Sequence, residues 1–361
     1  MFTALVPLRD AETSDLCRLV DPPPAESHVH VLAGEPGMGK TILLGQVIAR
    51  AREQRLTVLS STGRESEKDL AFAGLHQLLR PVLDRLDDLP ARQAHALRGA
   101  FGLTDDPVPP DALLTGLALL TVLSQISEEH RLLVVLDDCQ WLDQASLNTV
   151  IFAAHRLLDE PVTLILAGRT KLPTDFATTV LQPLTSEDST RLLDQQPHPP
   201  RGQARAQILA QAAGNPLALT ELSKVVRHGH HLASEPLPLT DRLTAIMAAT
   251  FQDLPSVVRE DLLLAAVADG ARVPGVTAAT LAPAEKAGLV RIDGAGPQFT
   301  HPLVRAAVYH AVPFAERAAV HLRVAEALHD QPDRRAWHRA AAALEPDEGV
   351  AALLERTAAQ A

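Results

Sequence analysis

The sequence predicts an α/β fold, a doubly wound parallel sheet followed by smaller and mainly helical domains. Three observations predict this fold class. Apolar runs of strand length recur along the first half of the chain, at residues 28–33, 56–60, 131–136, 161–167 and 178–184. Segments with helical patterning separate these runs, and strands that alternate with helices form parallel sheets. A glycine-rich loop directly follows the first run, between a predicted strand and a predicted helix.

The first strand is predicted from the alternation of side chains over residues 28–33. Apolar residues continue over 42–49 in the pattern of a buried helix, which we expect to begin near Gly39. Residues 131–136 form a continuous apolar run, typical of a strand that is buried on both faces of a parallel sheet.

Between the second and third strands we expect a long helical insertion, over residues 70–98 and 111–126, which the proline-rich residues 105–110 divide. The apolar residues 113–126 favour a core helix that covers the sheet, because polar residues interrupt them and they are too few to span a bilayer. A further helix is expected over residues 144–158.

The second half of the chain is predicted to be mainly helical. Thr185 begins the first helix as its cap, helices continue to about Val226, and residues 227–238 form a linker. Over residues 240–308 we expect two helices and then a short strand pair, as in a winged helix. The predicted domains are a P-loop α/β domain over 1–184, a helical lid and linker over 185–238, a winged-helix-like domain over 239–312 and a helical segment over 313–361.

Composition excludes several classes of function. The chain has 44 acidic and 33 basic residues and a formal net charge of −11, which argues against a DNA-binding surface. Cys17 and Cys139 form no Cys-x-x-Cys pair, so neither a disulfide framework nor a zinc site is indicated, and Cys139 is expected to be buried and inert. Without a signal pattern or a membrane span, we expect a cytoplasmic protein.

Residues 34–41 read Gly-Glu-Pro-Gly-Met-Gly-Lys-Thr, a complete Gly-x-x-x-x-Gly-Lys-Thr phosphate-binding loop. Its glycines allow backbone conformations that point successive N–H groups at an anion. Lys40 supplies a charge for the β- and γ-phosphates, and the Thr41 hydroxyl suits a Mg²⁺ ligand. The sequence therefore predicts a site for ATP or ADP with Mg²⁺. The loop residues expected to bind the nucleotide are Gly34, Glu35, Pro36, Gly37, Met38, Gly39, Lys40 and Thr41.

Charged residues also follow the third and fourth strands. Asp137 is expected to hold Mg²⁺ through water, and Asp138 to orient and deprotonate an attacking water, although Asp138 could instead only cap a turn. Arg169 would lie near the γ-phosphate and distinguish ATP from ADP, or else be a surface arginine at a strand end. Asp138, Lys40 and Arg169 are the predicted catalytic residues.

These motifs together resemble one protein family. The chain is similar to the ATPase region of the STAND signal-transduction NTPases, P-loop NTPases of AAA/STAND-like fold, and most similar to the large ATP-binding regulators of the LuxR family. The motifs that carry the resemblance are residues 34–41, 133–143, 164–169 and 214–219. Further segments that read like that family are residues 72–79, 301–309 and 335–339.

The resemblance implies an ATP/ADP switch with slow hydrolysis in place of a fast enzyme. Pro216, in the first turn of a predicted helix, would touch the adenine from the lid. His301 would sense ADP phosphates from the winged helix, or else only cap its own helix. Trp141 is expected to pack under the site, and Asp143 to cap the following helix. The family's initial Gly-Arg-x-x-Glu segment has Leu8 in the glycine position here, which puts a base contact by residues 8–12 in doubt.

Alternatives remain for the function. The family normally continues to a C-terminal helix-turn-helix, and this sequence stops at Ala361 without a credible recognition helix. The chain could therefore be a regulator's nucleotide switch, or a truncated stand-alone ATP-binding protein that acts through protein partners or self-association without DNA binding. A small-molecule kinase is a third possibility. A metal site at His228, His230 and His231 is less favoured than a solvated loop.

Overall fold

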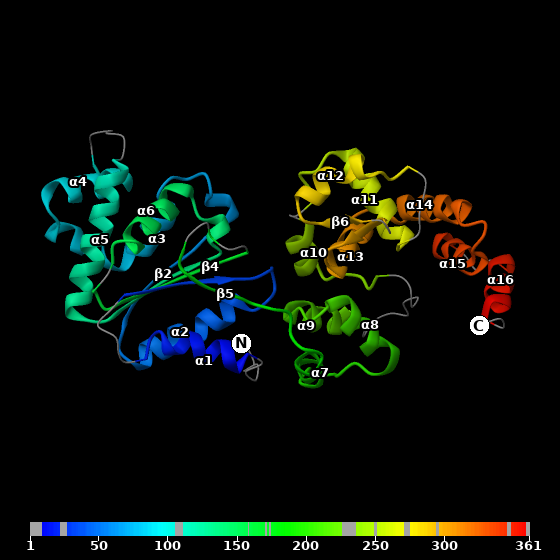
Figure 1. Ribbon diagram of the computed structural model, residues 1–361, viewed down its shortest axis with the longest axis horizontal. Coiled ribbons are helices and arrows are strands. Elements are labelled where there is room, and N and C mark those ends of the chain that lie inside the picture. The colour runs from blue at the N-terminus through cyan, green and yellow to red at the C-terminus, as the bar shows by residue number, and fades with distance from the viewer. Residues whose placement is uncertain are drawn as a thin grey trace. The chain divides into compact units, whose positions relative to one another are not determined.

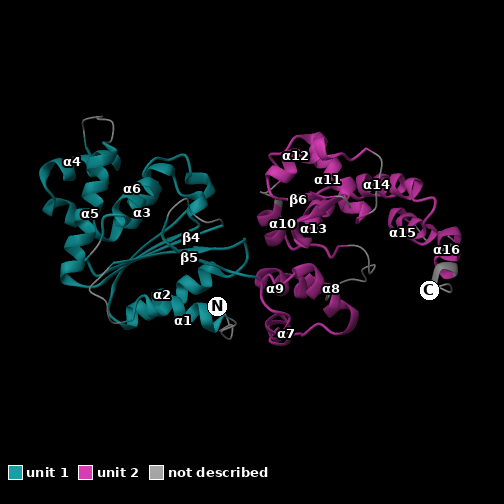
Figure 2. Ribbon diagram, viewed as in Figure 1, with its two compact units in different colours: residues 1–182 teal, residues 183–361 magenta. Residues whose placement is uncertain are grey.

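The computed structural model consists of two compact units, residues 1–182 and 183–361 (Figure 2), and each is described by itself. The residues that the structure describes are 9–21, 27–104, 111–157, 159–169, 172, 175–225, 236–248, 251–270, 275–293, 296–344 and 348–358. The predicted proline-rich turn at residues 105–110 and the histidines His228, His230 and His231 lie outside them. Within the described ranges, no helix is long and apolar enough to cross a membrane.

A five-stranded parallel sheet forms the centre of the first unit (Figure 1). Its strands are β1 (His28–Ala33), β2 (Thr57–Thr62), β3 (Leu132–Asp137), β4 (Val162–Gly168) and β5 (Ala177–Val180). They are ordered β2-β3-β4-β1-β5, and every pairing is parallel. Since all the strands run the same way, their carboxyl ends meet at one edge of the sheet.

Helices cover both faces of this sheet, which confirms the predicted doubly wound fold. The helices of the first unit are α1 (Asp10–Arg18), α2 (Lys40–Glu53), α3 (Ala73–Leu79), α4 (Ala91–Ala100), α5 (Ala112–Glu129) and α6 (Gln144–Ala154). Three 3₁₀ helices join them, η1 (Glu65–Glu67), η2 (Arg80–Asp88) and η3 (Cys139–Trp141). In β3, Val134 packs into the layer formed with α3 to α6, and Val135 into the layer formed with α1 and α2.

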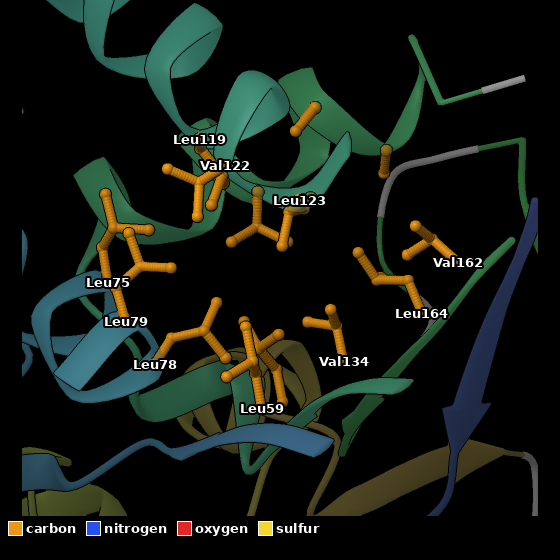
Figure 3. Close-up of a cluster of buried hydrophobic side chains, with 14 of the residues drawn as sticks. Leu59, Leu75, Leu78, Leu79, Leu119, Val122, Leu123, Val134, Val162 and Leu164 are labelled. Carbon is orange, nitrogen blue, oxygen red and sulfur yellow. The ribbon is translucent and has the colours of Figure 1, made fainter. Parts of the chain in front are cut away.

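Helix α5 is the core helix that residues 113–126 predict. Figure 3 shows its residues Leu119, Val122 and Leu123 directed at the strand side chains Val134 and Leu164. Its N-terminus is capped by Asp111, whose carboxylate accepts from the backbone N–H groups of the next turn. A fully buried leucine contributes about 1.5–3 kcal/mol to folding, so this layer supplies a large part of the unit's stability.

The last strand is shorter than the predicted residues 178–184. It ends at Val180, although the Leu181 N–H still donates to the Ala33 carbonyl at 2.8 Å. Pro183 has no N–H to donate, and the Leu184 N–H donates to the Gly214 carbonyl at 2.8 Å instead. The chain therefore leaves the sheet before Pro183.

The second unit is mainly helical. Its helices are α7 (Ser186–Asp194), α8 (Gly202–Ala212), α9 (Pro216–Val225), α10 (Asp241–Ala248), α11 (Ser256–Ala268), α12 (Ala278–Lys286), α13 (Pro302–His310), α14 (Phe314–Ala327), α15 (Pro332–Ala342) and α16 (Glu348–Ala358). Strands β6 (Val290–Asp293) and β7 (Gly296–Phe299) pair antiparallel. Thr185 caps α7, as predicted.

In the described part of residues 240–308, three helices precede the strand pair (α10, α11 and α12), so the expectation of two was wrong. The last of the three, α12, begins with a clear signal, since Thr277 and Thr280 form a capping box at its start. Pro283 lies inside α12, where a proline ordinarily interrupts the hydrogen-bond pattern of a helix.

Two buried histidines join α14 to α15. His321 and His338 are 0% and 1% exposed, and their Nδ1 atoms lie 2.9 Å apart. The Tyr309 hydroxyl lies 2.9 Å from Nε2 of His321. Burial, reinforced by neighbouring positive charges such as Arg317 and Arg334, lowers the pKa of each histidine to about 4. Both side chains are therefore neutral at pH 7.

This pair makes the second unit sensitive to acid. In the unfolded chain a histidine has a pKa near 6.5, so between about pH 6.5 and pH 4 the unfolded state binds more protons, and folding stability falls as the pH falls. Between pH 7 and pH 5 we expect a loss on the order of 3 kcal/mol, measured by urea unfolding at these two pH values. The variant His338→Gln should lose less on acidification, and His329→Gln, at an exposed position, should behave like the parent. Equal losses in all three proteins would contradict the assignment.

Candidate functional site

The phosphate-binding loop joins β1 to α2, as predicted. The Gly34 N–H donates to the Gly168 carbonyl at 3.1 Å, which fixes the start of the loop beside the end of β4. Gly37 and Gly39 have φ values of 82° and 95°, which other residues rarely adopt. Gly39 is the N-cap of α2, and no side chain among the described residues caps it. The helix thus presents its N-terminus at the loop, the arrangement that favours an anion.

The Lys40 side chain is held inside the loop. Its ammonium donates to the carbonyls of Gly34 at 2.6 Å and Glu35 at 3.0 Å, and the residue is 7% exposed. Burial lowers the pKa of Lys40, and the nearby carboxylates of Asp138 and Asp137 oppose this shift. These two hydrogen bonds hold the Lys40 ammonium at the place where the loop would bind phosphates.

The Thr41 hydroxyl and Asp137 lie side by side. Oγ1 of Thr41 donates to Oδ2 of Asp137 at 2.7 Å, and the Asp138 N–H donates to Oδ1 at 2.8 Å. Burial raises the pKa of Asp137, because its charge is removed from water, although these hydrogen bonds oppose the shift. A hydroxyl next to a buried carboxylate offers the hard oxygen ligands that Mg²⁺ prefers, so these two residues fit a magnesium ion.

Asp138 lies in a tight turn after β3. Its φ of 51° and ψ of 47° are left-handed, and its carbonyl accepts from the Trp141 N–H at 2.8 Å. The end of β2 packs directly on this turn at Gly63, where a Cβ atom would lie 2.4 Å from the Asp138 carbonyl oxygen. The Gly63 N–H also donates to the Asp137 carbonyl at 2.9 Å. A side chain at position 63 would therefore displace the turn that carries both aspartates.

Arg169 follows β4 and contacts the same turn. Its backbone N–H donates to Oε1 of Gln140 at 3.1 Å, and its guanidinium carbon lies 4.9 Å from the centre of the Trp141 ring. This is a cation–π contact on a half-buried side chain. The loop, Asp137, Asp138 and Arg169 are thus brought together at the carboxyl ends of β1, β3 and β4.

Pro216 and His301 lie in the second unit. Pro216 is the first residue of α9, and the Asn215 side chain accepts from the Ala218 N–H at 3.1 Å. His301 is the N-cap of α13, and its Nδ1 accepts from the Leu303 N–H at 3.0 Å. Capping is the alternative that the sequence left open for His301. The roles of Pro216 and His301 toward a nucleotide remain predictions.

A base contact by residues 8–12 was left in doubt by the sequence and stays a prediction. Leu8 lies outside the described residues, and the Arg9 guanidinium bonds to Glu12 at 3.0 Å and to the Gln182 carbonyl at 2.7 Å. Cys139 is 1% exposed, and burial raises the pKa of its thiol to about 12, so it stays protonated and unreactive. No group of three metal-binding side chains occurs in the described part of the chain.

Sequence reasoning missed the roles of Gln140 and Gly63. Gln140 joins Asp138 to Arg169, since its Nε2 donates to Oδ1 of Asp138 at 2.8 Å. Asp143 caps α6 as predicted, and it also accepts from the Phe72 and Gly74 N–H groups of α3. The sequence offers a partial signal only, because Gln140 is a single amide in the otherwise apolar residues 139–142 between Asp138 and Asp143.

Residues 5–167, which include the phosphate-binding loop and β1 to β3, match the family model of the AAA ATPase domain. This stretch contains the loop and both aspartates, and it is similar to ATPase domains of the AAA kind. A search of curated proteins found no match.

Among solved structures, the chain resembles the Walker-type ATPase PABY2304 of Pyrococcus abyssi, with 15% identity and a TM-score of 0.48 over 83% of this chain and 95% of that one. It also resembles Cdc6p of Pyrobaculum aerophilum, with 14% identity and a TM-score of 0.43 over 91% and 97%. A STAND protein with a tetratricopeptide repeat sensor, PH0952 of Pyrococcus horikoshii, is 18% identical with a TM-score of 0.37. That match covers 96% of this chain and 49% of the longer protein.

Proposed function

We propose that this chain is an ATP-binding nucleotide switch that hydrolyses ATP slowly and controls a transcriptional regulator of the LuxR type. One observation carries the proposal. A continuous series of hydrogen bonds runs from Thr41 through Asp137 and the Asp138 turn to the backbone of Arg169. Together with the buried Lys40 charge, this arrangement combines groups for binding phosphate with a carboxylate placed to act on water.

In this proposal each side chain has a separate task. Lys40 and the N–H groups of the loop bind the β- and γ-phosphates, and Thr41 and Asp137 hold Mg²⁺, which when bound neutralises phosphate charge. Asp138 accepts a proton from the attacking water as the new oxygen–phosphorus bond forms and the bond between the β–γ bridging oxygen and the γ-phosphorus breaks. Arg169 stabilises the charge on the γ-phosphoryl group. The products are ADP and inorganic phosphate.

The regulatory part of the proposal concerns residues 183–361. Residues 185–238 would form a lid whose Pro216 contacts the adenine, and 239–312 a winged-helix-like domain whose His301 responds to ADP. We place the protein in the cytoplasm, acting through protein partners or self-association. The resemblance of residues 133–143, 214–219 and 301–309 to the regulators of this family supports these assignments.

The test uses the full chain with Mg²⁺ and ATP. We expect tight retention of ADP and phosphate release below about 0.1 s⁻¹, roughly a hundredfold under the median enzyme turnover of about 10 s⁻¹. Hydrogen exchange in residues 183–361 should differ between the ADP-bound protein and the protein bound to a non-hydrolysable ATP analogue. Binding of neither nucleotide would overturn the proposal. Fast turnover with identical exchange patterns would leave an ATPase but exclude a switch.

A further inference from the structure

The Gln140 side chain uses both ends of its amide within the site. Nε2 donates to Oδ1 of Asp138 at 2.8 Å, and Oε1 accepts from the Arg169 N–H at 3.1 Å. A carboxylate only accepts and a backbone N–H only donates, so one orientation of the amide satisfies both partners. The side chain at this position must therefore supply both a donor for Asp138 and an acceptor for the Arg169 N–H, and an amide supplies both.

Asp138 is held at its backbone as well as at its carboxylate. Its N–H donates to Asp137 and its carbonyl accepts from the Trp141 N–H, which fixes the left-handed turn. The bond from Gln140 then restricts the remaining freedom, rotation of the side chain. The distance at which a general base works is narrow, about 2.6–3.2 Å from the proton that it removes, so this rotation decides whether Asp138 can act.

The same turn also holds Arg169 at two points. Gln140 bonds to its backbone, and the Trp141 ring lies under its guanidinium. Successive residues of η3 therefore join the carboxylate at the end of β3 to the cation at the end of β4. A displacement of Arg169 would be transmitted to Asp138 through the amide of Gln140.

We propose that Gln140 is a positioning residue that sets the orientation of the Asp138 carboxylate relative to Arg169. The inference rests on the proposed ATPase activity and adds to it a residue that acts through Asp138. Gln140 makes two hydrogen bonds, and different substitutions remove both of them or only the one to Asp138.

Two variants of the full chain separate this role from a structural one. Gln140→Met keeps the length of the side chain and loses both bonds. Gln140→Glu keeps an acceptor for the Arg169 N–H but places a carboxylate against Asp138, which repels it. If Gln140 orients Asp138, both variants should lose about 10- to 100-fold in kcat, a part of the 10²–10⁴-fold that a general base supplies. KM for ATP and the affinity for a non-hydrolysable ATP analogue should stay within about twofold.

A readout independent of turnover is the Asp138 side chain itself. Crystal structures of both variants should show its carboxylate rotated from the position seen in the parent. The matched control is Gln144→Ala, because Gln144 lies at the start of α6 and, among the described residues, its side chain bonds only to the exposed Asn148. This variant should match the parent in kcat and structure.

The outcomes are distinct. Wild-type turnover by Gln140→Glu, with a loss only in Gln140→Met, would show that the amide merely ties η3 to β4 and would overturn the inference. Equal turnover in all proteins would overturn it as well. A parent protein that binds nucleotide without hydrolysing it would remove the proposed ATPase and this inference with it.

Discussion

Replacing Lys40 by alanine is expected to reduce the affinity for both ATP and ADP by about 30- to 5,000-fold. The ammonium is buried and already directed into the loop by the Gly34 and Glu35 carbonyls, so little reorganisation is needed to meet phosphates. Removing one partner of a buried charge pair costs about 2–5 kcal/mol, which corresponds to that range of affinities. Titration of the purified protein with a fluorescent nucleotide measures the change.

The control for this prediction is Lys68→Ala, which removes a lysine of the same unit at an exposed position. Its affinity for nucleotide should equal that of the parent. Circular dichroism should show that Lys40→Ala keeps its helix content. Nucleotide binding by Lys40→Ala at the parental affinity would refute the assigned role of the loop.

Asp143→Ala is expected to be the most destabilising of these substitutions in the first unit. Its carboxylate is 3% exposed and accepts three backbone N–H groups, from Phe72 at 2.8 Å, Gly74 at 3.0 Å and Ser146 at 2.8 Å. Alanine would leave these donors without an acceptor. Because a buried unsatisfied donor costs about 1–3 kcal/mol, we expect a total loss on the order of 3–5 kcal/mol.

Urea unfolding followed by circular dichroism gives the total change, and hydrogen exchange measured by mass spectrometry locates it. Peptides from α3 and the start of α6 should exchange faster in Asp143→Ala. The matched control is Asp111→Ala, since Asp111 is also an N-cap but is exposed and caps α5 alone. Its loss should be about 1 kcal/mol. Similar losses in the two variants would mean that the bonds to α3 contribute nothing.

The sequence predicted the elements whose signals are local. The loop at 34–41 requires its glycines wherever it occurs, and the apolar run before Asp137 has no stable place except inside a sheet. Asp143 was predicted as a cap because it directly precedes a helical pattern. These features depend on neighbours within a few residues, so a single sequence is enough to read them.

The missed features depend on distant partners. Gln140 has a role only because the end of β4 lies beside η3, and Gly63 because β2 packs on the same turn. The contacts of Asp143 with α3 join residues that are 69 and 71 positions apart. No local pattern marks such pairs.

The strand order has a consequence for how the protein is made. The strand before the phosphate loop, β1, pairs with β4 and β5, which begin only at Val162 and Ala177. At about 5–20 residues per second, on the order of 10 s pass between the synthesis of β1 and the synthesis of β4 or β5. During that time both of its edges are open to wrong partners. A ribosome-bound chain therefore exposes both edges of β1 until β4 has been synthesised.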